Sequence, residues 1–368
     1  MNKNLKVIVS GGGTGGHIFP AVAIAKEIKS QFPNAEILFV GALGKMEMEK
    51  VPKEGFEIVG LPIAGFNRSN LLANIGFPVK LFKSLIKAYK VVKGFKPDIA
   101  IGVGGFASGP TLFMANLTGV KTLIQEQNSY AGVTNKWLSK KASKICVAYP
   151  EMECFFPKDK LIFTGNPIRK DILNGNLSKE ESRTSFGLEK DRKTLLIIGG
   201  SLGALSINKA ISKNLQKLLN EDIQIIWQTG KTYIDTAKEA VGAVHTSRVY
   251  VSDFIYEMDK AYVATDFVIS RAGALSVSEL SVVAKPAILV PFPFAAEDHQ
   301  TKNAESLSKN NAAILIKDSE ISDKVEEIIH SFSNNEGLLQ ELSENIKKFA
   351  KPNAAQEIVA AVKNIIKK

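Results

Sequence analysis

Short apolar runs of strand length alternate with helical segments along this chain, and most of the runs end in a turn that contains glycine. The runs in the first half are KVIVS, EILFV, DIAIGV, KTLIQE and KICVAY. After a polar stretch the pattern restarts with TLLII, IQIIWQTG, VYVSDFI, DFVIS and PAILVPFP. Strands that alternate with helices predict a parallel sheet covered by helices on both faces. We therefore predict the α/β fold class, with two doubly wound, Rossmann-like domains.

The length of 368 residues supports two domains, because one ordinary core rarely organises so long a chain. We place an N-terminal domain at 1–166 and a C-terminal domain at 167–351, joined near GNPIRKDIL by a linker within 164–193. A final helix over 352–368 could pack back on either domain, the N-terminal one included. Ligands of such folds bind outside the carboxyl ends of the strands, so we expect the domains to face a central cleft.

The remaining composition is typical of a soluble protein of a reducing compartment. Cys146 and Cys154 are the two cysteines, and neither has a partner at zinc-site spacing, so we expect free thiols in the cytoplasm. The first residues lack the apolar core of a secretory leader. Residues 99–120 carry no ionisable side chain, but their glycines and Pro110 favour a buried strand, a glycine turn and a packed helix over a membrane span.

The net charge of +10 is concentrated in one window. No acidic residue lies between Glu57 and Asp98, and lysines at helical spacing form one face of a predicted helix there: Lys80, Lys83, Lys87 and Lys90. The apolar residues that we expect on another face are Leu81, Leu85, Ala88 and Val92. A basic face beside apolar residues fits an anionic membrane surface, whereas nucleic acid is a poorer fit because no recognised binding motif is present.

The first glycine turn, in VIVSGGGTGGHIFP, satisfies the dinucleotide fingerprint G-x-G-x-x-G with Gly11, Gly13 and Gly16, ahead of a helix predicted from Pro20 to Gln31. A dinucleotide site also needs an acidic residue at the end of the second strand to hold the ribose. Gly41 or Ala42 occupies that position, and Glu36 only opens the strand. The turn therefore predicts binding of some phosphorylated ligand, with NAD(P) as the weaker alternative.

His17 follows the last glycine of this turn. At a helix N-terminus it could accept a proton as a base or donate a hydrogen bond to a phosphate or a sugar hydroxyl. A helix-capping or packing histidine is the alternative without a catalytic role.

Two motifs of the second half also suit a phosphorylated ligand. GGSLGA places Ser201 in a glycine turn, although a tight turn without a ligand has the same sequence. In SRAGALSVSEL, the residues Ala274, Leu275 and Ser276 open a predicted helix whose first turns carry Glu279. That carboxylate either accepts from ribose hydroxyls or stabilises the helix dipole.

Seven motifs occur in the order and at about the spacing of one known family: GGTGGH, GGFASGP, QEQNSYAGVTNKWLSK, GNPIR, GGSLGA, SRAGALSVSEL and PFPFAAEDHQTKNA. From Val7 to about Ala313 the chain resembles the MurG family of peptidoglycan N-acetylglucosaminyltransferases, which have the GT-B fold. After Ile316 the chain resembles the family only in the general character of its sequence.

The resemblance implies transfer of N-acetylglucosamine from UDP-GlcNAc to the C4 hydroxyl of a lipid-linked MurNAc-pentapeptide, with inversion at the anomeric carbon. It implies that Thr14, Gly15 and Gly16 contact the donor across the cleft and that Asn128 meets the sugar side. Arg169 and Ser201 would bind the diphosphate, Ile255 the uracil through its backbone, Glu279 the ribose and Gln300 the hydroxyls of GlcNAc. His299 replaces a glutamine found in some members.

The expected chemistry is a direct displacement without a metal or another cofactor. No Asp-x-Asp motif, which holds the metal of many glycosyltransferases, occurs in the chain. Helix N-termini after GGS and AGAL would stabilise the leaving UDP together with Ser201 and Arg169, and His17 is the candidate base. We expect peripheral attachment to the cytoplasmic face of the bacterial inner membrane.

Rival functions remain open from the sequence. Another GT-B enzyme, such as a glycolipid synthase or a UDP-GlcNAc 2-epimerase, shares the fold, although four histidines are few for an epimerase. An oxidoreductase lacks its ribose-binding acid. A non-catalytic nucleotide-sugar sensor would leave the basic apolar helix without a purpose.

Overall fold

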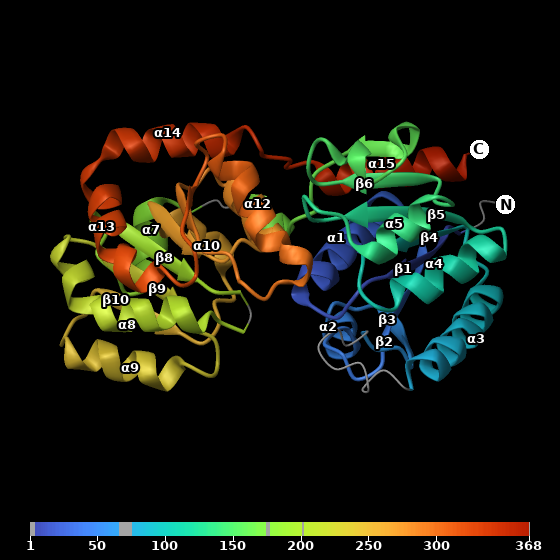
Figure 1. Ribbon diagram of the computed structural model, residues 1–368, viewed down its shortest axis with the longest axis horizontal. Helices are drawn as coiled ribbons and strands as arrows, with labels where there is room; N and C mark the ends of the chain where they lie inside the picture. The colour runs from blue at the N-terminus through green and yellow to red at the C-terminus, as the bar shows by residue number, and fades with distance from the viewer. Residues whose placement is uncertain (1–3, 66–75, 174–176, 201, 368) are drawn as a thin grey trace. The chain divides into compact units, whose positions relative to one another are not determined.

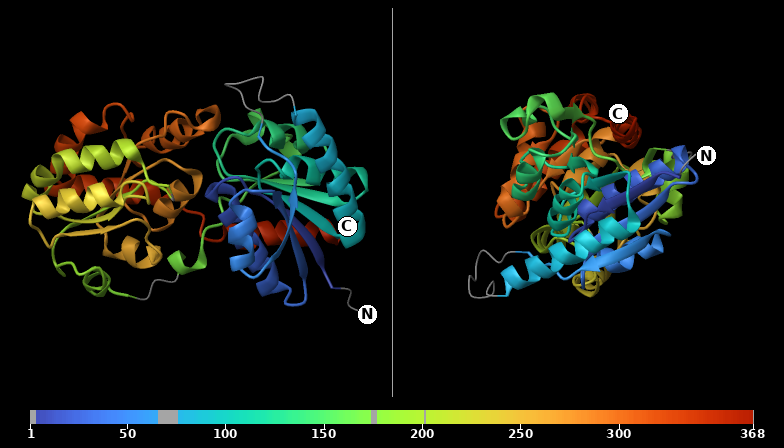
Figure 2. Two further views of the ribbon diagram at one scale, coloured as in Figure 1. Left: turned by 90° about the horizontal axis from the view of Figure 1, so that it is seen from below. Right: turned by 90° about the vertical axis from the view of Figure 1, so that its right-hand side faces the viewer.

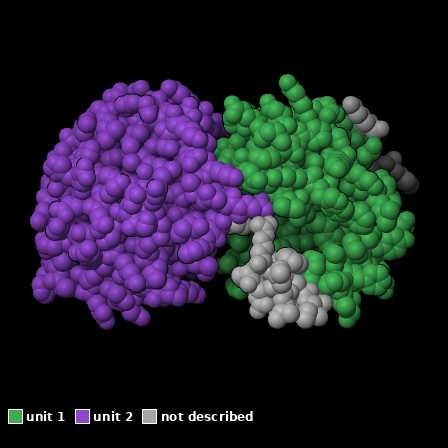
Figure 3. All heavy atoms as spheres, in the orientation of Figure 1, with its two compact units in different colours: residues 1–168, 353–368 green, residues 169–352 purple. Residues whose placement is uncertain are grey.

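The computed structural model describes residues 4–65, 76–173, 177–200 and 202–367. The chain forms two compact units (Figure 3). Unit 1 comprises residues 1–168 and 353–368, and unit 2 comprises residues 169–352. The sequence-based boundaries lie within two residues of these limits.

Unit 1 is a parallel sheet that the described residues build in the order β3-β2-β1-β4-β5-β6-β7 (Figure 1). Its strands are β1 (Lys6–Ser10), β2 (Glu36–Ala42), β3 (Glu57–Leu61), β4 (Ile99–Gly102), β5 (Lys121–Glu126), β6 (Lys144–Val147) and β7 (Leu161–Phe163). Its helices are α1 (Gly15–Gln31), α2 (Glu47–Lys53), α3 (Phe77–Phe95), α4 (Ser108–Leu117), α5 (Val133–Ser139) and α15 (Ala354–Ile366), with 3-10 turns η2 (Met152–Cys154) and η3 (Lys158–Lys160).

Unit 2 repeats this architecture in the order β10-β9-β8-β11-β12-β13 among the described residues. Its strands are β8 (Thr194–Ile198), β9 (Gln224–Gln228), β10 (Val249–Ser252), β11 (Phe267–Ser270), β12 (Ala287–Leu289) and β13 (Ile314–Leu315). Its helices are α6 (Lys170–Leu173), α7 (Lys179–Ser185), α8 (Leu205–Asn220), α9 (Ile234–Ala243), α10 (Met258–Ala264), α11 (Ala274–Val282), α12 (His299–Ser308), α13 (Ile321–Asn334) and α14 (Glu336–Lys347), with the 3-10 turn η4 (Ala296–Asp298).

Burial on both faces explains why the strands are continuously apolar rather than alternating. In β1, Val7 and Val9 pack against α1 and α15, whereas Ile8 points to the other face, toward α3 and α4. All three side chains are fully buried. In a parallel sheet covered by helices on both faces, successive side chains of a strand are all buried, so the strand is a continuous apolar run. The predicted fold class, α/β with two doubly wound domains, is thus confirmed by the sheet orders.

The final helix α15 returns to unit 1 and completes its core. Ile358, Val359 and Val362 are fully buried in the same cluster as Val7 and Val9. Figure 2 shows this helix, in red, with the blue and green elements of unit 1. Each fully buried aliphatic side chain contributes about 1.5–3 kcal/mol of transfer free energy, so α15 stabilises unit 1 although the whole of unit 2 separates it in sequence.

Local predictions agree with the structure at most elements, and the differences have clear causes. Residues 99–120 form β4, a glycine turn and α4, as predicted, and within the described ranges no helix is long and apolar enough to cross a membrane. The helix expected from Pro20 begins earlier, at Gly15, because Thr14 has the extended conformation of an N-cap. The strands β3, β7 and β13 were not predicted, since they are short or interrupted by polar residues and glycine.

Both cysteines are free thiols, as predicted. Cys146 is buried in β6, and burial raises the pKa of its thiol to about 12. Cys154 is exposed.

Two glycine turns of unit 1 pack backbone against backbone where β1 and β4 end. Gly105 has φ +85°, and a Cβ built there would lie 2.3 Å from the carbonyl oxygen of Gly12. No side chain fits such a contact, so this position requires glycine for both space and conformation.

We expect Gly105→Ala to lower the free energy of unfolding by about 2 kcal/mol or more, because the new Cβ must push the two turns apart. Gly94→Ala is the matched control, since Gly94 lies in α3 with nothing within 4 Å of a built Cβ. The control should be neutral or slightly stabilising. Urea unfolding curves of both variants measure the difference, and equal midpoints would contradict the argument.

Candidate active site

The N-terminal half of the candidate site is the turn between β1 and α1. Thr14 is the exposed N-cap, and Gly15 and Gly16 are the first residues of the helix. Because β1 and β4 are neighbours at the point where the strand order reverses, this turn and the turn after β4 meet at the edge where ligands of doubly wound sheets bind.

His17, in the first turn of α1, lies between these two turns. Its Nδ1 is 3.1 Å from the carbonyl oxygen of Gly12 and 3.4 Å from the hydroxyl of Thr14. A carbonyl oxygen only accepts hydrogen bonds, so Nδ1 carries the proton and the neutral ring has its lone pair on Nε2. The ring also packs on Gly104, where a Cβ would lie 2.6 Å from its Cδ2. The imidazole is therefore held in the tautomer that a base at Nε2 requires.

Glu47, which the sequence analysis missed, occupies the glycine turn itself. This carboxylate is only 1% exposed at the start of α2. Oε2 accepts from the N–H of Gly13 at 2.8 Å and Oε1 accepts from the N–H of Ala42 at 2.9 Å. The end of β2 lacks the ribose-binding acid of a dinucleotide site. It is contacted instead by the carboxylate of Glu47, which faces the glycine turn. The dinucleotide alternative is inconsistent with this arrangement, because Glu47 takes up an N–H that would meet the pyrophosphate.

A second buried carboxylate orders the loop after β5, where Asn128 lies. Glu126 accepts hydrogen bonds from the backbone N–H groups of Asn128 and Gly132, both at 3.1 Å, and from the side chain of Asn135 at 2.8 Å. Burial raises the pKa of Glu126, while these hydrogen bonds lower it in part. Asn128 is therefore fixed at the carboxyl end of the sheet, in the same unit as His17.

In unit 2 the glycine turn after β8 leads into α8. A Cβ on Gly203 would lie 2.0 Å from the carbonyl oxygen of Thr229, so this turn packs against the turn after β9 as closely as its counterparts in unit 1. The side chain of Gln228 joins the turn to the next loop, because Nε2 donates to the carbonyl of Gly200 at 3.0 Å and Oε1 accepts from the N–H of Ile255 at 2.9 Å. The predicted Ser201 lies outside the described residues.

This bridge limits how Ile255 can contact a ligand. Its side chain is buried and its N–H already donates to Gln228. A backbone contact from Ile255 to a ligand is thus expected from its carbonyl group.

The N-terminus of α11 carries the residues predicted to open a helix. Ala274 is its first residue, followed by Leu275 and Ser276, so that prediction is confirmed. Glu279, one turn on, is half-buried, and its Oε2 accepts from the hydroxyl of Tyr262 at 2.9 Å.

Arg169 and Glu279 are brought together in unit 2. The guanidinium Nε of Arg169 is 3.9 Å from Oε1 of Glu279. Burial raises the pKa of Glu279, and the charge of Arg169 and the hydrogen bond from Tyr262 lower it in part. A carboxylate and a guanidinium beside a helix N-terminus offer acceptors for hydroxyl groups and a cation for an anion within one small region.

Gln300 lies in the first turn of α12, next to the turn that precedes α11. Its Oε1 accepts from the N–H of Phe292 at 2.9 Å, so its side-chain amide is oriented by the loop after β12. Asn303, further along α12, donates to the carbonyl of Ala272 at 3.3 Å. These bonds fix α12 against the start of α11. Because the Gln300 oxygen already accepts from Phe292, we expect the Gln300 side chain to donate to a ligand through its NH₂ group.

Arg271 holds these loops together, and nothing in the sequence marked it beyond its place in SRAGALSVSEL. The buried guanidinium donates to the carbonyl of Val290 at 3.0 Å, to the hydroxyl of Ser206 at 2.9 Å and to Asp318 at 2.5 Å. Arg271 thereby ties the ends of β11 and β12 to the start of α8. Only these long-range contacts identify it.

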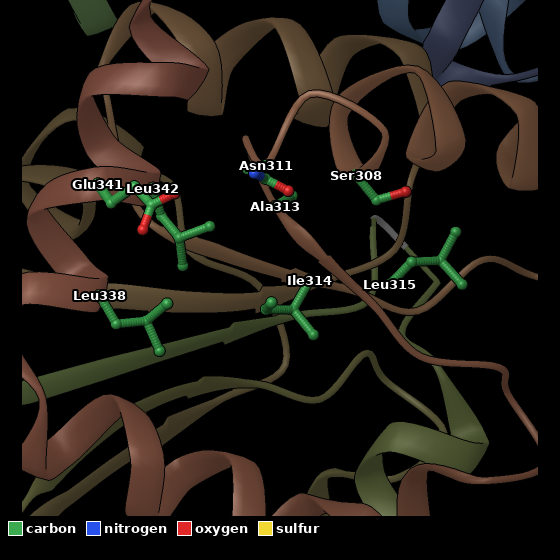
Figure 4. Close-up of a pocket in the computed structure, with 8 residues that line it drawn as sticks. All are labelled: Ser308, Asn311, Ala313, Ile314, Leu315, Leu338, Glu341 and Leu342. Carbon is green, nitrogen blue, oxygen red and sulfur yellow. The ribbon is translucent and has the colours of Figure 1, made fainter.

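Among the described residues, no cluster of three His, Cys, Asp or Glu side chains is arranged to hold a metal ion. An open hollow of about 560 Å³ lies in unit 2 between the α12–β13 turn and α14 (Figure 4). Ser308, Asn311 and Leu338 line it, and it includes none of the predicted site residues.

Comparison with known proteins agrees with this division of the chain. The glycosyltransferase family 28 N-terminal domain matches residues 7–147, and the glycosyltransferase family 28 C-terminal domain matches residues 194–358. The crystal structure of Acinetobacter baumannii MurG superposes with a TM-score of 0.77 at 30% identity, covering 98% of this chain and 99% of that one. This chain belongs to the MurG family of glycosyltransferases.

A curated MurG-family protein is more similar still. The UDP-N-acetylglucosamine--N-acetylmuramyl-(pentapeptide) pyrophosphoryl-undecaprenol N-acetylglucosamine transferase of Porphyromonas gingivalis is 53% identical over 366 residues, which cover 99% of this chain and 97% of that protein. By contrast, the UDP-GlcNAc 2-epimerase of Neisseria meningitidis matches with a TM-score of 0.69 at 13% identity, which shows a shared fold alone. The two doubly wound units are thus the two domains of the GT-B fold, and the transferase prediction is favoured over the epimerase.

Proposed function

We propose that this chain transfers GlcNAc from UDP-GlcNAc to the C4 hydroxyl of undecaprenyl-pyrophosphoryl-MurNAc-pentapeptide, with inversion at the anomeric carbon. The observation that carries the proposal is the 53% identity, over nearly the whole chain, to a transferase named for that donor and acceptor. The product is the lipid-linked disaccharide-pentapeptide precursor of peptidoglycan, which serves cell-wall growth, cell shape and cell division.

The edge of unit 2 is the proposed donor site. Glu279 accepts from the ribose hydroxyls, the carbonyl of Ile255 contacts the uracil, and Gln300 donates to the hydroxyls of GlcNAc. Arg169, with Ser201, binds the diphosphate. The N-termini of α8 and α11 add positive potential, which stabilises charge on the departing UDP without a metal ion.

The edge of unit 1 supplies the base. His17 Nε2 removes the proton of the C4 hydroxyl while that oxygen forms a bond to the anomeric carbon of GlcNAc. The bond from the anomeric carbon to the UDP oxygen breaks at the same time, and its electron pair leaves with UDP. Thr14, Gly15 and Gly16 remain the predicted contacts of this edge with the donor, and Asn128 remains the predicted contact on the side of the sugar.

Release of UDP from UDP-GlcNAc in the presence of EDTA tests the function. We expect release only when the lipid-linked MurNAc-pentapeptide is added, with kcat lowered about 100-fold or more in His17→Gln and little change in KM for the donor. Binding of UDP-GlcNAc without acceptor-dependent release would overturn the assignment of the acceptor. Abolition of release by EDTA would overturn metal independence.

The pH dependence of UDP binding tests the role of Glu279. The ionised carboxylate is the better acceptor for ribose hydroxyls, so affinity should fall as pH drops through the raised pKa of Glu279. Tyr262→Phe removes a hydrogen bond that lowers this pKa, so the loss of affinity should move to higher pH. Glu279→Gln should bind UDP about tenfold or more weakly, with no such dependence. Calorimetric titration measures the affinity for UDP of the wild type, Tyr262→Phe and Glu279→Gln across pH. An unshifted pH dependence for Tyr262→Phe would contradict this role of Glu279.

Helix α3 is the proposed membrane contact. Four large apolar side chains face solvent on it, 43% to 65% exposed: Val79, Phe82, Ile86 and Tyr89. They differ from the apolar set expected from the sequence, of which Ala88 and Val92 are buried in the core. Each exposed apolar residue directly precedes one lysine of the basic set, Lys80, Lys83, Lys87 and Lys90.

An exposed apolar stripe flanked by lysines is typical of helices that lie in the interface of an anionic bilayer. The proposed location is therefore peripheral, at the cytoplasmic face of the inner membrane, where the lipid-linked acceptor lies. Nucleic acid is not a proposed partner.

Replacing Lys80, Lys83, Lys87 and Lys90 by glutamate should weaken binding to vesicles of anionic lipid at least tenfold, because each lysine near such a surface contributes about 1 kcal/mol. Phe82→Ser should weaken binding at high salt as well, since apolar insertion is not screened. The control replaces four exposed lysines of unit 2 by glutamate: Lys209, Lys231, Lys238 and Lys309. Co-sedimentation in which the α3 variant and this control behave alike would refute the contact.

A further inference from the structure

Glu47 is a buried carboxylate to which the proposed mechanism gives no task. It is 1% exposed, and each of its oxygens accepts one backbone N–H, from Gly13 and from Ala42. Burial of a carboxylate is costly unless hydrogen bonds compensate for the lost water. Two backbone donors from segments far apart in sequence provide that compensation here.

The surrounding glycines leave the space that this carboxylate fills. A Cβ on Gly12 would lie 2.2 Å from Cδ of Glu47, and a Cβ on Gly41 would lie 2.6 Å from its Cγ. Glycine turns before a helix ordinarily offer such space and such N–H groups to a phosphate. In this chain Glu47 is the anion of the first turn, so an external phosphate could use the N–H of Gly13 only after displacing it.

The same peptide group connects Glu47 to His17. Glu47 accepts from the N–H of Gly13, and His17 Nδ1–H donates to the carbonyl of Gly12. These two atoms belong to one planar peptide unit, so fixing the direction of its N–H also fixes the direction of its C=O. Hydrogen bonds in series polarise one another, so a carboxylate on the N–H strengthens the carbonyl as an acceptor for the imidazole.

We propose that Glu47 is a positioning residue for His17, acting through the Gly12–Gly13 peptide group. The arrangement gives His17 what a carboxylate gives a catalytic histidine by direct contact, namely a fixed tautomer and ring orientation. It rests on the proposed function only in the statement that His17 Nε2 accepts the acceptor's proton.

Glu47→Gln is the sharpest test, because it keeps the size of the side chain. Its amide oxygen can accept from one N–H, but its NH₂ group faces the other N–H as a second donor. We expect kcat to fall about tenfold or more while KM for UDP-GlcNAc stays within about twofold, since most of the proposed donor residues lie in unit 2. Nitrogen chemical shifts should show the neutral His17 ring moving away from the Nδ1–H tautomer. The spectrum of His17→Gln lacks the His17 signal and thereby identifies it among those of the four histidines.

Glu27→Gln is the matched control. Glu27 is another buried carboxylate of unit 1, 4% exposed in the body of α1, where it accepts from Gln31. The control should leave both kcat and the His17 tautomer unchanged. Urea unfolding of both variants distinguishes a loss of kcat from a loss of stability. Formate added to Glu47→Ala should restore part of kcat, because it can occupy the vacated space.

Three results would overturn the proposal: an unchanged His17 tautomer in Glu47→Gln, an unchanged kcat, or equal losses of kcat in Glu47→Gln and Glu27→Gln. The tautomer is measured without turnover, so it tests Glu47 even if the wild-type protein releases no UDP. That absence of release would instead refute the proposed function.

Discussion

Backbone turns that approach one another without room for side chains determine where the chemistry of this protein can lie. Gly105 meets the carbonyl of Gly12 in unit 1, and Gly203 meets the carbonyl of Thr229 in unit 2. Parallel strands end at one edge of a sheet, so the turns that follow them crowd together there. Glycine at these positions brings peptide N–H and C=O groups, rather than side chains, to the surface that a ligand meets.

The two units use this edge differently. In unit 1 the chain's own carboxylates, Glu47 and Glu126, accept from backbone N–H groups of the loops. In unit 2 the carboxylate of Asp318 is paired with Arg271 and accepts from the hydroxyl of Ser206 at the start of α8. This difference is consistent with the proposal of a nucleotide diphosphate at the unit 2 edge and a neutral hydroxyl acceptor beside His17.

Fold similarity alone would not have separated the rival functions. An epimerase structure matches this chain with a TM-score of 0.69 at 13% identity, so the fold is shared by proteins of different activity. The described candidate residues of this chain include the imidazole of His17, whose Nδ1 lies against a carbonyl oxygen, and the carboxylate of Glu279 beside the guanidinium of Arg169. In the proposed function they are the base of unit 1 and part of the donor site of unit 2.

The sequence by itself determined most of the strands and the glycine turns, because apolar periodicity and glycine act over a few residues. It missed β3, β7 and β13, and it placed the start of α1 at Pro20 instead of Gly15. It also located His17, Glu279 and Arg169 through motifs. Only the tertiary structure decided that Glu47 fills the first turn, that Arg271 joins three loops and that Phe82 faces solvent while Ala88 is buried. Glu47 and Gly13 are 34 residues apart, and their contact depends on how β1 pairs with β2. Register between distant segments has no local signature, and for that reason these contacts could not be predicted from the order of the residues.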